Sequence, residues 1–500
     1  MWLEGFTIAT QPGNLLYLLL GTIFGLFVGA LPALGPLFGV SLMLPFTFGM
    51  PPVSAIILLV AVHASTAYGD SLASILINTP GGPGSIASCW DGYPMAKQGK
   101  AAIALGISTL SSLLGGIIGW LTLVAVSPLL TSFAMKIGAA EYFMLGVMAL
   151  SLLSIAAKGE TIKGLMLGAL GLLLAFVGLD PIAGVNDRFT FGSVYLEDGL
   201  PLVPVTVGIF ALSQAIVLAE EGGTIAELFK LTGGIWKGFL ETLRRPLSII
   251  RGGLAGIWLG ILPALGLSAA GIVAYFFEKS SSKNPETFGK GNPAGLVAPE
   301  VSKNACVVGD LIPTFTLGIP GSAATAILLV ALTIHGMEPG PRFLLSGTMP
   351  YAIFSGILLA QFTFFIIGLL SARYFAMVVF IPNALLAPLI IFLSFIGSYA
   401  VRNRITDVMI TVFFGVIGYF FSKLRWPSAC LVLGLVLGDL VEANFHRALK
   451  IGDDSYTVFF TRPISLILFL ITVVFMLWPF LSEPIKNLFR RKGLTSGGSA

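Results

Sequence analysis

Long apolar runs separated by short polar segments dominate the chain. A membrane-spanning helix needs about 20 apolar residues. Eleven runs are of roughly this kind, at 14–34, 102–130, 140–157, 161–179, 200–219, 252–274, 344–371, 374–396, 405–422, 426–441 and 463–482. Two further stretches, 37–90 and 294–335, are apolar but interrupted by Pro, Gly and polar residues. The pattern predicts an all-α polytopic membrane protein with about 12–14 helices, including re-entrant hairpins.

Charged side chains are scarce, which supports this prediction. Lys, Arg, Asp and Glu make up 10% of the 500 residues, whereas hydrophobic residues make up 56%. Soluble domains carry about 25% charged residues, so the composition excludes a cytosolic enzyme, a disordered chain and a nucleic-acid-binding protein. The three Cys and three His are scattered, without metal-ligand spacing. We therefore expect no metal site, no disulfide framework and no organic cofactor.

Two motifs occur twice, in the same order. Leu31-Pro32-Ala33-Leu34-Gly35 returns as Leu262-Pro263-Ala264-Leu265-Gly266. Gly69-Asp70 is followed by Pro80-Gly81, and Gly309-Asp310 is followed at the same spacing by Pro320-Gly321. The repetition predicts an internal duplication, with a first membrane repeat over 1–230 and a second over 231–500.

The basic residues indicate how the two repeats are oriented. Lys and Arg gather in 230–251 and in the tail 486–492, whereas residues 1–96 contain neither. Cytoplasmic loops carry an excess of Lys and Arg, so both basic segments, and with them the C-terminus, should be cytoplasmic. The helix before Pro263 would then run outward and the helix before Pro32 inward. This predicts inverted repeats, which in transporters place broken helices at a substrate site near the bilayer midplane.

The Pro-Ala-Leu-Gly turns are the first candidate site. Pro and Gly break helices and free backbone polar groups, which inside a membrane must face protein or a cavity. The residues expected at the substrate are Pro32, Ala33, Leu34, Gly35, Pro263, Ala264 and Gly266. The alternative is an ordinary loop at the membrane surface.

The Pro-Gly motifs are the second candidate site. Each follows a segment too short to span the bilayer, 71–79 or 311–319, and each is interpreted as the tip of a re-entrant hairpin. Backbone N–H groups at a following helix start suit an anion. The residues expected there are Asn78, Thr79, Pro80, Gly81, Pro320, Gly321 and Ser322. Close helix packing is the alternative role of these glycines.

Acidic residues lie in both interrupted stretches. A carboxylate inside a membrane is costly and is a functional candidate by default. Asp70 and Asp310, with Ser71 and Asn304 nearby, are expected to couple transport to Na⁺ or H⁺; the alternative places both acids in water. Lys303 would pair with Asp310 or a substrate carboxylate, or lie at the surface. The polar stretch 90–100 is interpreted as a cytoplasmic loop with a turn at Asp91-Gly92.

These residues together resemble the large membrane subunit of the tripartite tricarboxylate transporter family. The resemblance covers most of the chain and is densest in 21–105 and 251–345. Its motifs are Gly29–Pro36, Tyr68–Ser71, Asn78–Gly81, Asp91–Ala96, Phe288–Gly291, Ala298–Glu300, Pro313–Ser322 and His335–Pro341.

The resemblance implies a multi-pass protein of the bacterial inner membrane. It further implies two partners, a small membrane subunit of about four helices and a periplasmic solute-binding protein. The implied activity is uptake of organic di- or tricarboxylates such as citrate, coupled to Na⁺ or H⁺ without ATP.

Two other functions are compatible with the same residues. An intramembrane aspartyl protease would use Asp70 and Asp310 as a dyad that shares a proton, but the matched Pro-Gly motifs would then be unexplained. An ion channel is the third possibility. Matched motifs with a carboxylate near each favour coupled transport over an open pore.

Overall fold

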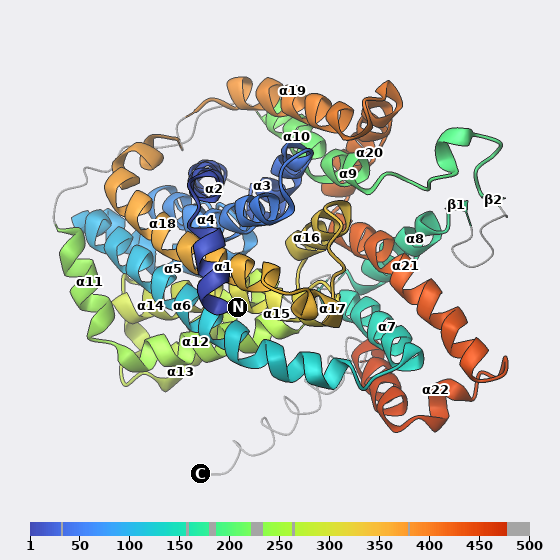
Figure 1. Cartoon of the computed structure of the whole chain (residues 1–500). Coiled ribbons are helices and arrows are strands. Elements are labelled where there is room, and N and C mark those ends of the chain that lie inside the picture. The colour runs from blue at the N-terminus through green and yellow to red at the C-terminus, as the bar shows by residue number, and fades with distance from the viewer. Residues whose placement is uncertain are drawn as a thin grey trace, which may run out of the picture. The chain divides into compact units, whose positions relative to one another are not determined.

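A computed structural model describes residues 1–31, 34–156, 160–179, 187–221, 234–262, 266–378 and 381–477. Apart from the two-residue antiparallel strands β1 (Gly178–Leu179) and β2 (Asp187–Arg188), the regular structure in these ranges is helical (Figure 1). The all-α prediction is therefore confirmed. Of the predicted site residues, Pro32, Ala33, Pro263 and Ala264 lie outside the described ranges, as does the basic tail.

Eight helices in the described ranges are long and apolar enough to cross a membrane. They are Pro12–Ala30, Pro52–Ile77, Ile86–Ala134, Leu202–Glu220, Met349–Leu370, Asn383–Arg402, Ile405–Lys423 and Ser428–Ile451. Six apolar helices are shorter, at Pro36–Thr47, Ala139–Ser151, Thr161–Ala175, Pro246–Ile261, Ala323–Ile334 and Pro463–Leu477. The chain is thus a multi-pass membrane protein, whereas the expected total of about 12–14 helices with hairpins stays a prediction.

The helices form two compact units. Unit 1 comprises Met1–Met135 and Pro201–Phe420, and unit 2 comprises Lys136–Leu200 and Phe421–Ala500. Unit 1 contains α1 (Trp2–Ala9), α2 (Pro12–Ala30), α3 (Pro36–Met43), α4 (Pro52–Ile77), α5 (Ile86–Met95), α6 (Ala101–Ala134), α9 (Leu202–Thr206), α10 (Ser213–Glu221), α11 (Ile235–Leu243), α12 (Pro246–Ile261), α13 (Gly266–Ser281), α14 (Pro293–Gly309), α15 (Leu311–Leu317), α16 (Ala323–Ile334), α17 (Pro341–Leu345), α18 (Met349–Val378), α19 (Asn383–Arg402) and most of α20 (Ile405–Lys423). The predicted repeats 1–230 and 231–500 are a different division of the chain, and this division stays a prediction.

Unit 2 is built on the packing of α21 against α7 and α8. Its helices are α7 (Ala139–Ala156), α8 (Thr161–Ala175), α21 (Ser428–Ile451) and α22 (Val458–Thr461). Gly171 and Gly434 allow α8 and α21 to approach closely, because a side-chain carbon on Gly434 would lie 2.2 Å from the Gly168 carbonyl oxygen. The partly buried ion pair of Arg188 with Glu442 connects β2 to α21.

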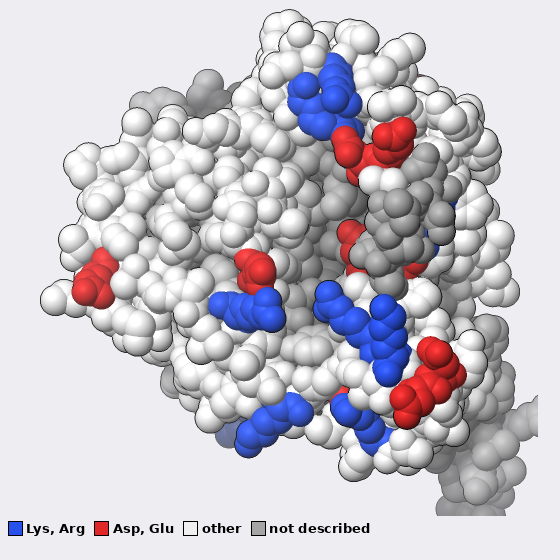
Figure 2. Space-filling view, turned by 45° about the vertical axis from the view of Figure 1, so that its right-hand side comes forward, with Lys and Arg blue, Asp and Glu red and all other residues white. Residues whose placement is uncertain are grey.

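The molecular surface matches a membrane environment. Figure 2 shows broad uncharged areas with Lys, Arg, Asp and Glu in small groups. Large apolar side chains such as Leu254, Trp258 and Leu370 are exposed. Surfaces of this kind are rare on soluble monomers and normal against lipid.

Glycines allow α2 to pack directly on the backbone of α4. Side-chain carbons on Gly21, Gly25 and Gly29 would lie 2.5, 2.7 and 2.4 Å from three carbonyl oxygens of α4. The three carbonyls belong to Leu58, Val62 and Thr66. Small residues at such crossings let helix backbones come together in membranes.

The packing of α12 on α14 has the same arrangement. Side-chain carbons on Gly252, Gly256 and Gly260 would lie 2.5, 2.2 and 2.7 Å from the carbonyl oxygens of Ala298, Ser302 and Cys306. These glycines follow those of α2 by 231 positions, and the carbonyls follow those of α4 by 240 positions. The same two offsets separate the repeated pentapeptides and the repeated Gly-Asp motifs, so the packing supports the predicted duplication.

Three sequence-based expectations about local structure are wrong. The segment 71–79 is not a separate short arm, because 71–77 are the last turns of the 26-residue helix α4. The run 252–274 is divided between α12 and α13. The stretch 90–100 is not a loop, because 90–95 belong to α5 and 96–100 form a short π-helical segment. Asp91 is buried there and accepts hydrogen bonds from the backbone N–H groups of Gly289, Gly291 and Asn292.

The contact of α2 with α4 predicts a position-specific effect of added methyl groups. Gly21→Ala should lower the free energy of unfolding by about 1–3 kcal/mol, because the packed backbone must shift. Gly13→Ala, also in α2, should leave stability unchanged or raise it slightly, since nothing lies within 4 Å of the added carbon. Thermal unfolding of the two variants in detergent would measure the difference. Equal stability of both would show that the crossing is not tight.

Candidate functional site

A buried lysine ammonium lies between α14 and α4. Lys303 Nζ is 2.7 Å from Asp70 Oδ1 and 3.3 Å from Glu300 Oε2, and it donates a short hydrogen bond to the hydroxyl of Ser71. All three charged side chains have 0% exposure. An unpaired charge in such a place would be prohibitively costly, so these groups depend on one another.

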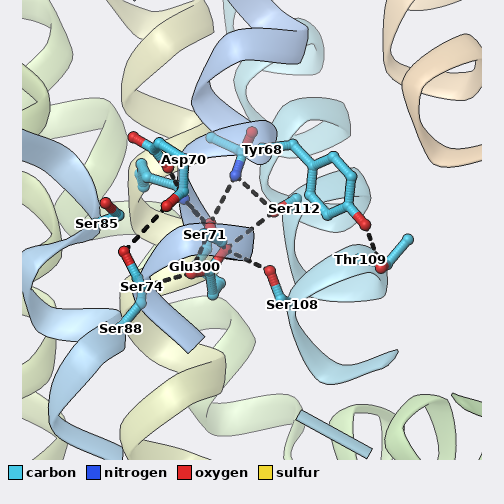
Figure 3. A network of polar contacts seen from close by, with 12 residues as sticks. Tyr68, Asp70, Ser71, Ser74, Ser85, Ser88, Ser108, Thr109, Ser112 and Glu300 are labelled. Atoms are coloured by element: carbon cyan, nitrogen blue, oxygen red, sulfur yellow. Dashed lines mark hydrogen bonds and ion pairs between the residues drawn. The ribbon is translucent and has the colours of Figure 1, made fainter. Parts of the chain in front are cut away.

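Glu300 is held by hydroxyl groups from three other helices. Ser71 of α4 and Ser108 of α6 donate hydrogen bonds of 2.8 and 3.0 Å to its carboxylate. Ser88 of α5 donates a short one, and Ser112 of α6 a longer one of 3.2 Å. Asn304 extends the network by donating to Ser112 at 2.7 Å. Figure 3 shows the serines converging on the carboxylate, with Tyr68 bonded to Thr109 beside them.

A second acid–base pair lies elsewhere in the same unit. His63 Nε2 of α4 is 3.3 Å from Oδ1 of Asp310, the residue between α14 and α15, and both side chains are buried. Asp310 follows Asp70 by 240 positions, and Lys303 follows His63 by 240 positions. In each pair, therefore, an acid from one predicted repeat contacts the base at the matched position of the other.

The two Pro-Gly turns have the same backbone conformation. Asn78 and Gly318 both adopt the left-handed conformation, with φ of 57° and 70°, and end α4 and α15. Gly82 and Ser322 are both extended, at φ −143° and −147°. Glycine is the residue that adopts positive φ without strain, and Asn is the next most tolerant.

Each turn rests on the acid of its own repeat. A side-chain carbon on Gly81 would lie 2.5 Å from Cα of Asp70, and one on Gly321 would lie 2.7 Å from Cα of Asp310. The N–H of Gly81 donates to the Asp70 carbonyl at 3.3 Å, and the N–H of Gly321 donates to Thr314 Oγ1 at 3.3 Å. Only glycine allows each turn to lie this close to the backbone of its aspartate. Gly81 and Gly321 are therefore required for packing, and they are also candidate binding residues.

The described parts of the two candidate sites lie together. The nearest atom to a side-chain carbon on Gly266 is Ser322 Cβ at 3.8 Å, and one on Gly82 would lie 3.1 Å from Cα of Gly35. The segment Pro83–Ser85 packs against α13, and α16 packs against α3. Leu34, Gly35, Gly81, Pro320 and Gly321 are buried, Thr79, Pro80 and Ser322 are half-buried, and Asn78 is exposed.

The structure corrects the expected environment of the charged residues. Lys303 pairs with Asp70 and not with Asp310, and it is buried rather than at the surface. Asp70 and Asp310 are also buried rather than in water. Ser71 and Asn304 join the network of Lys303 and Glu300, away from the Asp310 pair.

Sequence reasoning did not assign a role to Glu300 or His63. His63 could have been found, because the offset of 240 positions that relates Asp70 to Asp310 relates it to Lys303. No comparable signal existed for Glu300, whose four serine partners come from α4, α5 and α6.

The fold and the site define a polytopic helical membrane protein with a buried network of charged residues. Sequence comparison identifies its family. Residues 15–433 match the tripartite tricarboxylate transporter TctA family. The chain is 34% identical over 462 residues to an uncharacterized 52.8 kDa protein in the TAR-I ttuC' 3'region of Agrobacterium vitis, an alignment that covers 92% of each chain. It is 33% identical over 241 residues to an uncharacterized protein in the TAR-II ttuC' 3'region of the same organism, covering 47% of this chain and 98% of that one.

The chain belongs to the TctA family and is the large membrane subunit of a tripartite tricarboxylate transporter. It is a transporter and not an enzyme, which removes the aspartyl protease alternative. The geometry agrees, because Asp70 contacts Lys303 and Asp310 contacts His63, and neither is bonded to the other as a protease dyad requires.

The Lys303 network predicts a strong dependence of each charge on its partner. Lys303→Met should lower the free energy of unfolding by about 3–5 kcal/mol, because it leaves buried carboxylates uncompensated. Adding Asp70→Asn should restore part of that loss. Arg342→Met, which breaks the exposed pair with Glu338, should have little effect. Thermal unfolding in detergent would test all three, and additive losses for Lys303 and Asp70 would mean that the pair is not coupled.

Proposed function

We propose that this chain imports organic di- or tricarboxylates, such as citrate, across the bacterial inner membrane. Transport is coupled to Na⁺ or H⁺, which is lost to the cytoplasm with the substrate. The observation that carries the proposal is the convergence of Gly35 with Gly82, and of Gly266 with Ser322, at two turns that each rest on a buried aspartate.

Backbone and hydroxyl donors at these turns suit a carboxylate. Ser322 caps α16, exchanging hydrogen bonds with Thr325, and the next N–H groups of the helix have no intrahelical acceptor. Such N–H groups carry partial positive charge. Asn78, the counterpart of Gly318, is exposed at the C-terminal end of α4. The substrate would contact these groups together with Thr79, Pro80, Gly81, Pro320 and Gly321.

The buried charges favour cation coupling. When ionised, Asp70, Glu300 and Asp310 bring three negative charges to the buried core of unit 1, and Lys303 offsets one. A trianion moving inward works against the membrane potential by about 2.3 kcal/mol per charge per 100 mV, so more than three cations would have to accompany citrate for the potential to help. Asp70 and Asp310, with Ser71 and Asn304, are the proposed coupling residues.

Membership of a tripartite family supports two partners. These are a small membrane subunit of about four helices and a periplasmic solute-binding protein that delivers the substrate. The distribution of Lys and Arg supports a cytoplasmic C-terminus. An ion channel would need no binding protein, so strict dependence of flux on that protein separates the two functions.

Uptake into proteoliposomes tests the proposal. This chain and its small subunit would be reconstituted with the binding protein outside, and labelled citrate and a panel of dicarboxylates would be offered. Na⁺ and pH gradients would be imposed separately. Accumulation that needs one gradient is the expected result, whereas flux without the binding protein and without coupling would favour a channel.

Bulky substitution at the turns should block uptake. Asn78→Trp should reduce citrate uptake to background while membrane insertion is retained, because the side chain would fill the proposed site. Asn403→Trp is the matched control, since Asn403 is also an exposed, left-handed residue at a helix end. Ser322→Trp should act like Asn78→Trp. Normal uptake by both turn variants would remove these residues from the site.

Removing either aspartate charge should change the ion dependence. Asp70→Asn and Asp310→Asn each delete a buried negative charge, so fewer cations are needed for electroneutrality. Uptake measured against Na⁺ concentration and against pH would reveal the change. Unchanged dependence in both variants would assign the two aspartates to structure alone.

A further inference from the structure

The two matched acid–base pairs differ in the kind of cation that they contain. Lys303 is surrounded by oxygens of Asp70, Ser71 and Glu300. His63 contacts a single oxygen, Oδ1 of Asp310, while its own Nδ1 and the other carboxylate oxygen of Asp310 are buried without a partner. Asp70 Oδ2 likewise has no partner, so the two pairs differ in their bases. The Lys303 ammonium has an oxygen partner for each of its three N–H groups, whereas His63 keeps an unused ring nitrogen.

The two bases also differ in whether their charge can change. A lysine paired with two carboxylates stays charged, so its position is permanently occupied by a cation fixed to the chain. Histidine is the side chain whose charge changes between about pH 5 and 8. A neutral His63 that donates its Nε2 proton to Asp310 leaves Nδ1 as a bare acceptor, and one added proton would turn it into an N–H donor.

We propose that His63 and Asp310 form the exchangeable proton site of this transporter, and that Lys303 is a tethered cation in the matched, non-exchanging site. The inference rests on the proposed carboxylate transport. It assigns exchange of the coupling cation to the Asp310 pair alone, so that Asp70 and its neighbours affect the ion dependence only through their charge. A proton from the outer water binds Nδ1 of neutral His63, making an imidazolium beside the Asp310 carboxylate, and leaves to the cytoplasmic water. One N–H bond forms and breaks in each cycle, with no other covalent change.

The position of Asp310 connects this proton to the substrate turn. The turn 318–322 rests on the backbone of Asp310 through Gly321. Thr314, which accepts the Gly321 N–H, donates in turn to the Asp310 carbonyl at 2.6 Å. A change of charge at the Asp310 pair therefore acts directly on the backbone at Pro320, Gly321 and Ser322.

Few other charged groups lie on the helices around His63. On α4 itself there are Asp70 and Tyr68, and α14 carries Glu300, Lys303 and the thiol of Cys306; α5 carries Asp91, Cys89 and Tyr93. Helices α2, α3, α6 and α16 have no Asp, Glu, Lys or Arg, and α18 has none over 349–370. Lys303 is already bound to Asp70 and Glu300, and Asp91 is bound to backbone N–H groups. Asp310 thus remains the direct charge partner of His63.

The protonation of His63 can be measured directly, without transport. The chain has three histidines, so nitrogen NMR of ring-labelled protein in liposomes, assigned with His335→Gln and His446→Gln variants, resolves each one. We expect both the neutral and the doubly protonated form of His63 to be detected as the pH is varied, because the proposed site takes up and releases a proton at Nδ1. A single protonation state at every pH at which the transporter accumulates substrate would overturn the proposal.

Transport then tests whether this proton is the coupled one. With the membrane potential held at zero, a one-unit pH gradient coupled to one proton sustains about tenfold accumulation. Labelled citrate and succinate should reach that ratio with the wild-type chain and with His446→Gln, a variant in unit 2. With His63→Gln the ratio should fall to about one, and an unchanged ratio would refute the assignment. If His63→Gln transports neither citrate nor succinate, the NMR measurement of His63 protonation decides whether the proposal stands.

The outcomes separate this inference from the proposed function. Accumulation driven by a Na⁺ gradient, with His63 in one protonation state, would retain carboxylate transport and overturn the proton site. A titrating His63 with no accumulation of either probe under either gradient would retain the proton site and overturn carboxylate transport.

Discussion

Burial of three carboxylates among apolar helices is the constraint on which this structure depends. Asp70, Glu300 and Asp310 have 0% exposure, and a charge at such depth costs several kcal/mol unless it is paired and hydrogen-bonded. Lys303, His63 and four serine hydroxyls supply that compensation. Because acids and partners come from different helices, α4, α5, α6 and α14 must hold one arrangement.

The glycine contacts make that arrangement possible. In a membrane no hydrophobic driving force brings helices together, so close van der Waals packing and polar contacts must do so. Gly29 brings α2 against α4 beside the backbone N of Asp70, and Gly260 brings α12 against α14 beside Gly309. The same small residues that hold the helices together therefore fix the two aspartates at the ends of the packed segments, under the two turns.

The sequence allowed the helical class, the family and the matched turns to be predicted, because periodicity and repeated motifs are local signals. It did not allow the partner of each acid to be predicted. Lys303 is seven residues from Asp310 in the chain yet binds Asp70, 233 residues away, since pairing depends on how α4 and α14 meet. The role of Glu300 could not be predicted for the same reason. The stretch 90–100 has the polar composition of a loop, but Asp91 is satisfied by a distant backbone segment.

The balance of buried charge also bears on the order of events in transport. With His63 neutral and the three acids ionised, Asp70, Glu300, Asp310 and Lys303 together carry two net negative charges close to the turns proposed to receive an anion. Like charges in a low-dielectric interior repel strongly, so a carboxylate would meet an unfavourable potential there. Binding of a cation, the proton on His63 in our proposal, reduces that repulsion. By linkage, the bound carboxylate must in turn tighten the hold on the cation by the same factor. Coupling would then follow from electrostatics alone, with Lys303 setting how much of the repulsion remains for the exchangeable cation to remove.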